Sequence, residues 1–177
     1  MKKLLGSVFA ILFLLSLRAN AGYIDIYEDT IISTDLGAIV TVHGSAQITV
    51  LPGGDASVFY LTDTSSAIVY GGSASYRAKD SSVLNLYGGT FGSVGYDGSL
   101  AKIYVYGENF QIDPASDDHT TVFLKGNWLN GPSFDIYFRM LPQPFENAIG
   151  TNIFLIPEPI TISLMLFGIL GIRKFRG

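Results

Sequence analysis

Apolar residues alternate with polar ones through the middle of the chain, and each short alternating segment ends at a glycine. A period of two is typical of a β-strand with one buried face, and the frequent glycines and prolines argue against helices. Six segments align on their glycines: Ala38–Gly44, Ile48–Gly53, Ala67–Gly71, Leu84–Gly88, Ile103–Gly107 and Val122–Gly126. From Gly53 onward, successive glycines are 18, 17, 19 and 19 residues apart. This fixed short period indicates a solenoid of stacked coils.

A second apolar segment precedes each of three glycine segments and ends at an aspartate followed by turn-forming residues. These upstream segments are Ser57–Asp63, Ala74–Asp80 and Gly92–Asp97. One coil is therefore predicted to consist of a strand, an aspartate turn, a second strand and a glycine turn. Calcium ligation by Asp63, Asp80, Asp97 and Asp118 is the alternative role. One carboxylate per coil is far from the six to eight converging oxygens that calcium takes, so Asx-turn residues are favoured.

Alternation also predicts which side chains point inward. Residues two and four positions before each glycine are expected in the core: Val42/Val40, Leu51/Thr49, Val69/Ala67, Leu86/Leu84, Val105/Ile103 and Leu124/Val122. Residues one and three positions before it are expected outside: His43/Thr41, Pro52/Val50, Tyr70/Ile68, Tyr87/Asn85, Tyr106/Tyr104 and Lys125/Phe123.

The predicted fold is therefore mainly β, a small parallel β-solenoid with about 18 residues per coil. An antiparallel β-sandwich is the alternative, because strands of this spacing would show the same alternation. Residues 126–131 and 132–139 predict a terminal hairpin that caps the solenoid, with the single tryptophan, Trp128, covering the last coil. Tyr23–Tyr27 and Thr30–Thr34 predict a degenerate first turn, and Ile153–Ile156 a last strand.

The first 21 residues have the pattern of a signal peptide: a basic start, an apolar stretch and small residues at Ala19 and Ala21. Cleavage after Ala21 leaves residues 22–156 as one exported domain of 135 residues. This domain has 14 acidic and five basic residues, so a nucleic-acid partner is not expected. The chain has no cysteine, which excludes disulfides, thiolate catalysis and cysteine-ligated metals.

The end of the chain carries three consecutive signals. Pro157, Glu158 and Pro159 form a rigid acidic tripeptide, residues 160–172 are apolar and uncharged, and Arg173, Lys174 and Arg176 form a basic end. Thirteen helical residues span roughly 20 Å, which is short for a bilayer core of about 30 Å unless the flanking basic side chains reach the headgroups. The segment is predicted to be a transmembrane helix with its basic end in the cytoplasm.

This three-part tail resembles the PEP-CTERM sorting tail of exported bacterial envelope proteins. The resemblance implies recognition by an exosortase, a membrane transpeptidase, with removal of the helix and transfer to the cell surface or extracellular matrix. An ordinary C-terminal membrane anchor is the alternative. The segment Asp80–Gly89 also resembles the repeats common in such surface proteins.

Two groups of residues suggest chemistry within the domain. The outward tyrosines Tyr70, Tyr87, Tyr104 and Tyr106 would suit stacking of sugar rings, but a tyrosine ladder that stabilises stacked strands is the commoner role. Asp117, Asp118 and His119 are the one cluster of a histidine with carboxylates, and a solvated loop is the favoured interpretation. No catalytic motif, metal site or cofactor site is recognised.

The sequence therefore predicts a non-enzymatic, structural or adhesive protein of the envelope or extracellular matrix, held near exopolysaccharide. It is expected to be membrane-anchored through its C-terminal helix before processing. The alternatives are a carbohydrate-binding module that uses the tyrosine face and, less favoured, a polysaccharide-active enzyme on a β-helix scaffold.

Overall fold

The computed structural model of the protein describes residues 22–157, apart from residues 116, 118, 130 and 140. The predicted signal peptide, with Ala19 and Ala21, lies outside the described residues. So does the tail from Glu158 onward, with Pro159, Arg173, Lys174 and Arg176. Within the described part of the chain, no helix is long and apolar enough to cross a membrane.

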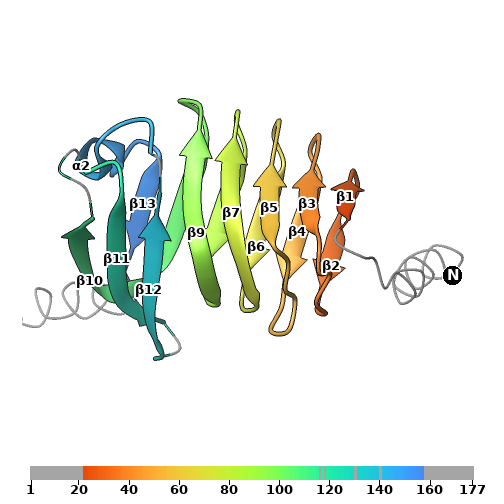
Figure 1. The fold of residues 1–177 in the computed structure, drawn as a ribbon, viewed down its shortest axis with the longest axis horizontal. Coiled ribbons are helices and arrows are strands. Elements are labelled where there is room, and N and C mark those ends of the chain that lie inside the picture. The colour runs from red at the N-terminus through yellow and green to blue at the C-terminus, as the bar shows by residue number, and fades with distance from the viewer. Residues whose placement is uncertain (1–21, 116, 118, 130, 140, 158–177) are drawn as a thin grey trace, which may run out of the picture.

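From β1 to the start of β10, two parallel sheets face each other across the core, and the chain crosses from one to the other after each strand (Figure 1). We call them sheet A and sheet B. The parallel part of sheet A contains β1 (Tyr23–Ile26), β3 (Ile39–Val42), β5 (Val58–Leu61), β7 (Ser73–Lys79) and β9 (Thr90–Asp97). Sheet B contains β2 (Thr30–Ile32), β4 (Gln47–Val50), β6 (Ser66–Val69) and β8 (Val83–Leu86).

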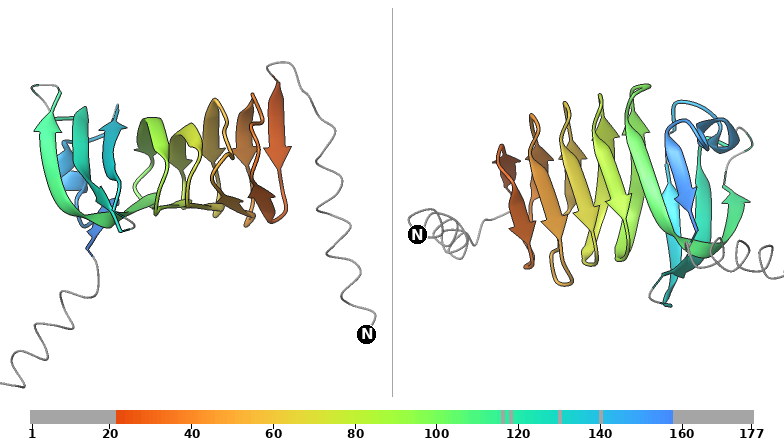
Figure 2. Two further views of the ribbon diagram at one scale, coloured as in Figure 1. Left: turned by 90° about the horizontal axis from the view of Figure 1, so that it is seen from below. Right: turned by 180° about the vertical axis from the view of Figure 1, so that it is seen from behind.

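The pairing register confirms the predicted solenoid and its period. In sheet B, Ile48 pairs with Ala67, Ala67 with Leu84, and Leu84 with Ile103, in steps of 17 to 19 residues. Sheet A has the same parallel pairing from coil to coil, and both layers are visible from below in Figure 2. The alternative of an antiparallel sandwich is therefore wrong for residues 22–97.

The core lies between the two sheets and is filled by the alternating inward residues. Large residues of one sheet share a coil with small residues of the other: Phe59 and Leu61 precede Ala67 and Val69, and all four are fully buried. This alternation of sizes lets each coil fill its interior at the density of a protein core. Among the inward predictions, Val40, Val42, Leu84, Leu86, Ile103 and Val105 are confirmed as buried.

A row of aromatic side chains runs through this core. The sequence analysis did not identify it. Ring centroids lie 5.1 Å apart between Phe59 and Tyr76, 5.7 Å between Tyr76 and Phe91, and 5.9 Å between Phe91 and Trp128. Trp128 continues the row to Phe134 at 4.3 Å. The prediction that Trp128 covers the last coil is thus confirmed, since Phe91 belongs to the last coil strand of sheet A.

Three details of the predicted alignment are wrong. Ala38–Gly44 belongs to sheet A, because β3 pairs with β1 there. It therefore does not align with the segments of sheet B that end at a glycine. In Ile48–Gly53 one extra residue precedes the glycine, so Ile48 and Val50 face inward where Thr49 and Leu51 were expected. Val122–Gly126 is not a sixth coil, because its strand runs antiparallel to its neighbours.

The C-terminal end departs from the repeat and forms a cap. Strand β10 (Lys102–Pro114) starts in sheet B beside β8 and ends in sheet A, where it pairs antiparallel with β11 (Val122–Trp128). β11 forms the predicted hairpin with β12 (Ser133–Phe138), which joins β9. A short helix, α2 (Phe145–Ala148), precedes β13 (Ile153–Ile156), the predicted last strand, which pairs with β10 in sheet B.

Buried Asn152 holds this last segment to the final coil. Its amide nitrogen donates to the carbonyl oxygens of Ser99 at 3.1 Å and Ala101 at 2.8 Å. Its amide oxygen accepts from Gln143 Nε2 at 3.4 Å, and the same nitrogen of Gln143 lies 3.2 Å from Tyr96 Oη. Because buried amide groups are costly when unpaired, this network fixes where β13 docks.

Candidate functional surfaces

The outer face of sheet B carries the predicted tyrosine column. In the parallel register, equivalent side chains of successive coils lie directly beside one another. The ring centroids of Tyr70 and Tyr87 are 5.3 Å apart, and those of Tyr87 and Tyr106 are 4.0 Å apart with planes at 11°. Tyr104 is on the same face but in the next column, where it stacks on Phe154 of β13 at 4.8 Å. The structure therefore brings three of the four tyrosines into one ladder.

Stacking determines what this ladder presents to solvent. Each inner ring face is covered by the neighbouring tyrosine, so a ligand would meet mainly ring edges and hydroxyl groups. Tyr70, at the end of the stack, is 49% exposed. Tyr106 Oη donates to Asn85 Oδ1 at 3.4 Å, and burial, followed by its hydrogen bond with Tyr87, raises the pKa of Tyr106 to about 12.

The turn aspartates hydrogen-bond to the neighbouring coil. Asp63 and Asp80 have left-handed backbone conformations, with φ of 57° and 53°, as turn residues commonly do. Asp63 Oδ2 accepts from the backbone N–H of Gly44 at 2.9 Å, and Asp80 Oδ2 accepts from that of Asp63 at 3.2 Å. Both aspartates lie in turns, as predicted, but their carboxylates bond the preceding coil. The Asx-turn hydrogen bond expected within their own turn is not the one they make.

The third aspartate of this corner, Asp97, pairs with a cation. Arg77 of β7 donates to it through Nε at 3.0 Å and Nη2 at 2.6 Å. This hydrogen bonding lowers the pKa of the Asp97 carboxyl. Lys79 lies 5.0 Å from the ring centroid of Tyr60, a cation–π contact on the outside of sheet A. These basic residues thus join one coil to the next.

Asp117, Asp118 and His119 do not form a described metal site. Asp118 lies outside the described residues, and Nδ1 of His119 is 2.7 Å from Oε1 of Glu146 in α2. The backbone hydrogen bond of Glu146 and then this contact lower the pKa of Glu146. Among residues 22–157, less the four gaps, no three side chains of His, Cys, Asp or Glu gather as metal ligands.

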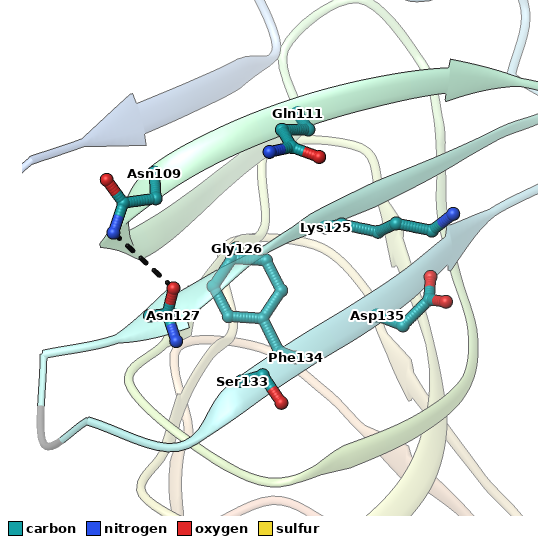
Figure 3. A pocket seen from close by; sticks show the side chains of 8 residues that line it. All are labelled: Asn109, Gln111, Lys125, Gly126, Asn127, Ser133, Phe134 and Asp135. Atoms are coloured by element: carbon teal, nitrogen blue, oxygen red, sulfur yellow. Dashed lines mark hydrogen bonds between the residues drawn. The ribbon is translucent and has the colours of Figure 1, made fainter.

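An open depression lies over the three antiparallel strands of the cap, where the chain no longer repeats (Figure 3). It has a volume of about 450 Å³. Its lining is polar apart from Gly126 and Phe134: Asn109 and Gln111 from β10, Lys125 and Asn127 from β11, and Ser133 and Asp135 from β12. Sequence analysis placed Lys125 outside, which is confirmed, and it predicted the hairpin, but it did not connect β10 to that hairpin. The alternating polar positions of residues 123–127 and 133–137 were the available signal.

A β-bulge shapes one side of this depression. β10 pairs Glu108 with Asn127 and Gln111 with Lys125, which leaves one extra residue in β10 between the two pairs. Asn109, within the bulge, has a φ of 55°. Its side-chain nitrogen lies 3.5 Å from Asn127 Oδ1 across the strands. Bulges commonly redirect side chains next to binding sites.

The start of the predicted sorting motif is described. Pro157 is exposed and follows β13 directly, so the last described strand ends one residue before the motif. No family model, curated protein or solved structure matches this chain in comparisons of its sequence and fold.

Proposed function

We propose that the chain is an exported structural or adhesive component of the cell envelope or extracellular matrix, released or anchored through its C-terminal tail. The support for the tail comes from the sequence of residues 157–176 and from its resemblance to a sorting tail. The enzyme that would recognise it is an exosortase-type transpeptidase. In this proposal the protein catalyses no reaction and needs no cofactor.

The observation that carries this proposal is the junction at Pro157. β13 completes sheet B at Ile156, and the next residue is already exposed. A transpeptidase needs an accessible segment to cleave, next to a domain that stays folded after cleavage. A proline also keeps the preceding residue extended, so the boundary between domain and tail is sharp.

The test is the C-terminal residue of the mature protein, measured by mass spectrometry in a host that carries an exosortase. The wild-type protein should end before the apolar run at residues 160–172. A variant with Pro157, Glu158 and Pro159 all changed to Ala should keep the run, whereas the control Glu146→Ala should be cut normally. If the tail remained uncut in all three proteins, the sorting proposal would be wrong and the tail would be an ordinary membrane anchor.

A carbohydrate-binding module is the second candidate, supported by the tyrosine ladder on sheet B. Tyr70 offers the most exposed ring of the ladder, and the hydroxyl groups of Tyr87 and Tyr106 can exchange hydrogen bonds with sugars. Tyr70→Ala and Tyr87→Ala should then abolish glycan binding without unfolding the protein. Glycan binding that survives both substitutions would contradict this candidate.

Turnover is the observation that would overturn the non-enzymatic assignment. The purified full-length chain should release no reducing ends or unsaturated products from any polysaccharide tested. If product appeared, Arg77→Ala would test whether this cation on the outer face of sheet A takes part in the turnover.

A further inference from the structure

The outer face of the β10–β11–β12 cap brings unlike side chains from three antiparallel strands together. Three rows of side chains cross it in register. The central row is Gln111, Lys125 and Asp135, and the next row along the same strands is Asp113, Phe123 and Tyr137. The other neighbouring row contains Asn127 and Ser133, with Asn109 at the bulge. Amide, hydroxyl and carboxylate groups are thus concentrated on one small surface.

Several of these polar groups are available to a ligand. Gln111, Ser133 and Asp135 are exposed, and their side chains make no hydrogen bond within the described part of the chain. The amides can both donate and accept, and a carboxylate can accept two hydrogen bonds. Vicinal hydroxyl groups require such paired donors and acceptors. The volume of about 450 Å³ falls in the range of small-molecule sites, roughly 300–1,000 Å³.

An aromatic pair adjoins the polar rows. Phe123 and Tyr137 stack across the strands with ring centroids 4.8 Å apart. This pair is the next one on the same face beside Lys125 and Asp135, two residues away in each strand. The ammonium of Lys125 is 6.0 Å from the centroid of the Phe123 ring, so the aromatic pair and the depression are contiguous. Polar groups beside an apolar ring surface suit the two kinds of surface that a pyranose presents.

The charges indicate which sugars would fit. Lys125 Nζ donates to Asp113 Oδ2 at 3.0 Å, and the nearby Asp135 adds a second carboxylate. These carboxylates raise the pKa of Lys125, and two of them beside one cation give this face a net negative charge. A uronic acid or a sulfated sugar would be repelled, whereas neutral hydroxyl groups would gain acceptors.

We propose that this face is a binding site for a neutral oligosaccharide, separate from the tyrosine ladder. Gln111, Ser133 and Asp135 hydrogen-bond the sugar hydroxyl groups, and Phe123 with Tyr137 contacts an apolar sugar face. The site deepens the proposed adhesive role, since it would attach the solenoid to a matrix glycan through its C-terminal cap. It does not depend on processing of the tail.

The test is calorimetric titration of the full-length chain in detergent with cellohexaose, laminarihexaose and mannohexaose, and with oligogalacturonate as the anionic comparison. At least one neutral hexasaccharide should bind, and oligogalacturonate should not. Gln111→Ala and Asp135→Ala should each weaken binding about fivefold to tenfold, the loss of one or two hydrogen bonds at an exposed site. Asp135→Asn, which keeps an acceptor, should weaken it less.

Tyr87→Ala is the matched control, because it changes the ladder on the opposite sheet. Binding that is lost in Tyr87→Ala but kept in Gln111→Ala would overturn this site and favour the ladder. Binding of no neutral sugar, or stronger binding of oligogalacturonate, would overturn it as well. Circular dichroism and thermal melting of each variant separate lost binding from lost folding. Mass spectrometry of the tail reports on the sorting proposal independently of all these outcomes.

Discussion

The two ends of the solenoid are built differently. At the N-terminal end the repeat starts with β1 and β2, and their outer edges have no strand beside them among the described residues. Tyr23 and Ile31 are 80% and 60% exposed there. At the C-terminal end the chain abandons the repeat, and β10, the β11–β12 hairpin, α2 and β13 cover the last coil (Figure 1).

The two regions of the molecule form different kinds of surface. Stacked coils give a regular surface on which one side chain lies beside its equivalent, as in the tyrosine ladder. The cap reverses strand direction and adds a bulge, so unlike side chains are brought together over β10, β11 and β12. In this second region the mixture comes from strands that do not repeat one another.

The largest effects are expected from cavities in the two regions. Leu84→Ala in a central coil should cost about 2–5 kcal/mol of unfolding free energy, and Phe138→Ala in the cap about 3–5 kcal/mol, because both side chains are fully buried. The sheets are continuous from coils to cap, so urea denaturation should show one transition in each variant. Two separate transitions in Phe138→Ala would show that the cap folds as a unit of its own.

A smaller loss is expected at the junction of the two regions. Asn152→Ala removes the donors to Ser99 and Ala101 and should cost about 1–3 kcal/mol. Hydrogen exchange of β13 should accelerate more than that of β6. Equal acceleration in both strands would mean that Asn152 supports the whole fold and not only the docking of β13.

Two serines in equivalent positions of successive coils give a matched test of hydrogen bonding within the repeat. Ser82 Oγ accepts from the backbone N–H of Lys79 at 2.9 Å, whereas the buried Ser65 Oγ has no hydrogen-bond partner among the described residues. Ser82→Ala should destabilise by about 1 kcal/mol, and Ser65→Ala should be neutral or slightly stabilising. Chemical denaturation measures both, and a loss of similar size in Ser65→Ala would reveal a partner such as a buried water.

The smallest effect concerns the alkaline stability of the ladder. The pKa of Tyr106 in the folded protein, about 12, lies above its ordinary value of 10.0. Its neutral form therefore contributes stability that is complete below pH 10 and is lost as the pH rises towards 12. Tyr106→Phe should flatten the fall in unfolding free energy between pH 10 and 12. The difference between variant and wild type at pH 8 gives the pH-independent part, and an unchanged slope would contradict the prediction.

The repeating part of the fold could be predicted from the sequence because every coil has the same alternation of apolar and polar residues. The parallel solenoid, its period, the hairpin and the strand at Ile153–Ile156 all follow from local patterns. The errors arose where a segment resembles the repeat but pairs differently. Val122–Gly126 has the right alternation, yet strand direction depends on the long-range path of β10, which no local pattern encodes. The extra residue before Gly53 likewise inverted the predicted facing of Thr49 and Val50.

The candidate surfaces divide in the same way. The tyrosine ladder was predictable because Tyr70, Tyr87 and Tyr106 occupy one position of the repeat. The depression was not, because Gln111 and Asp135 become neighbours of Lys125 only through antiparallel pairing and a bulge. The same holds for His119 and Glu146, which are 27 residues apart in sequence and meet only through α2.

Strand β10 belongs to both sheets, and this gives the domain a mechanical property. A load applied at Pro157 passes first into β13, which runs parallel to the beginning of β10, where β8 also pairs. Pulling along the strands would shear the whole ladder between Ile103–Tyr106 and Ile153–Ile156 at once instead of opening its hydrogen bonds one by one. Any force that β10 receives is then distributed to sheet B through β8 and to sheet A through β11, so the domain resists extension from its C-terminus as a single body.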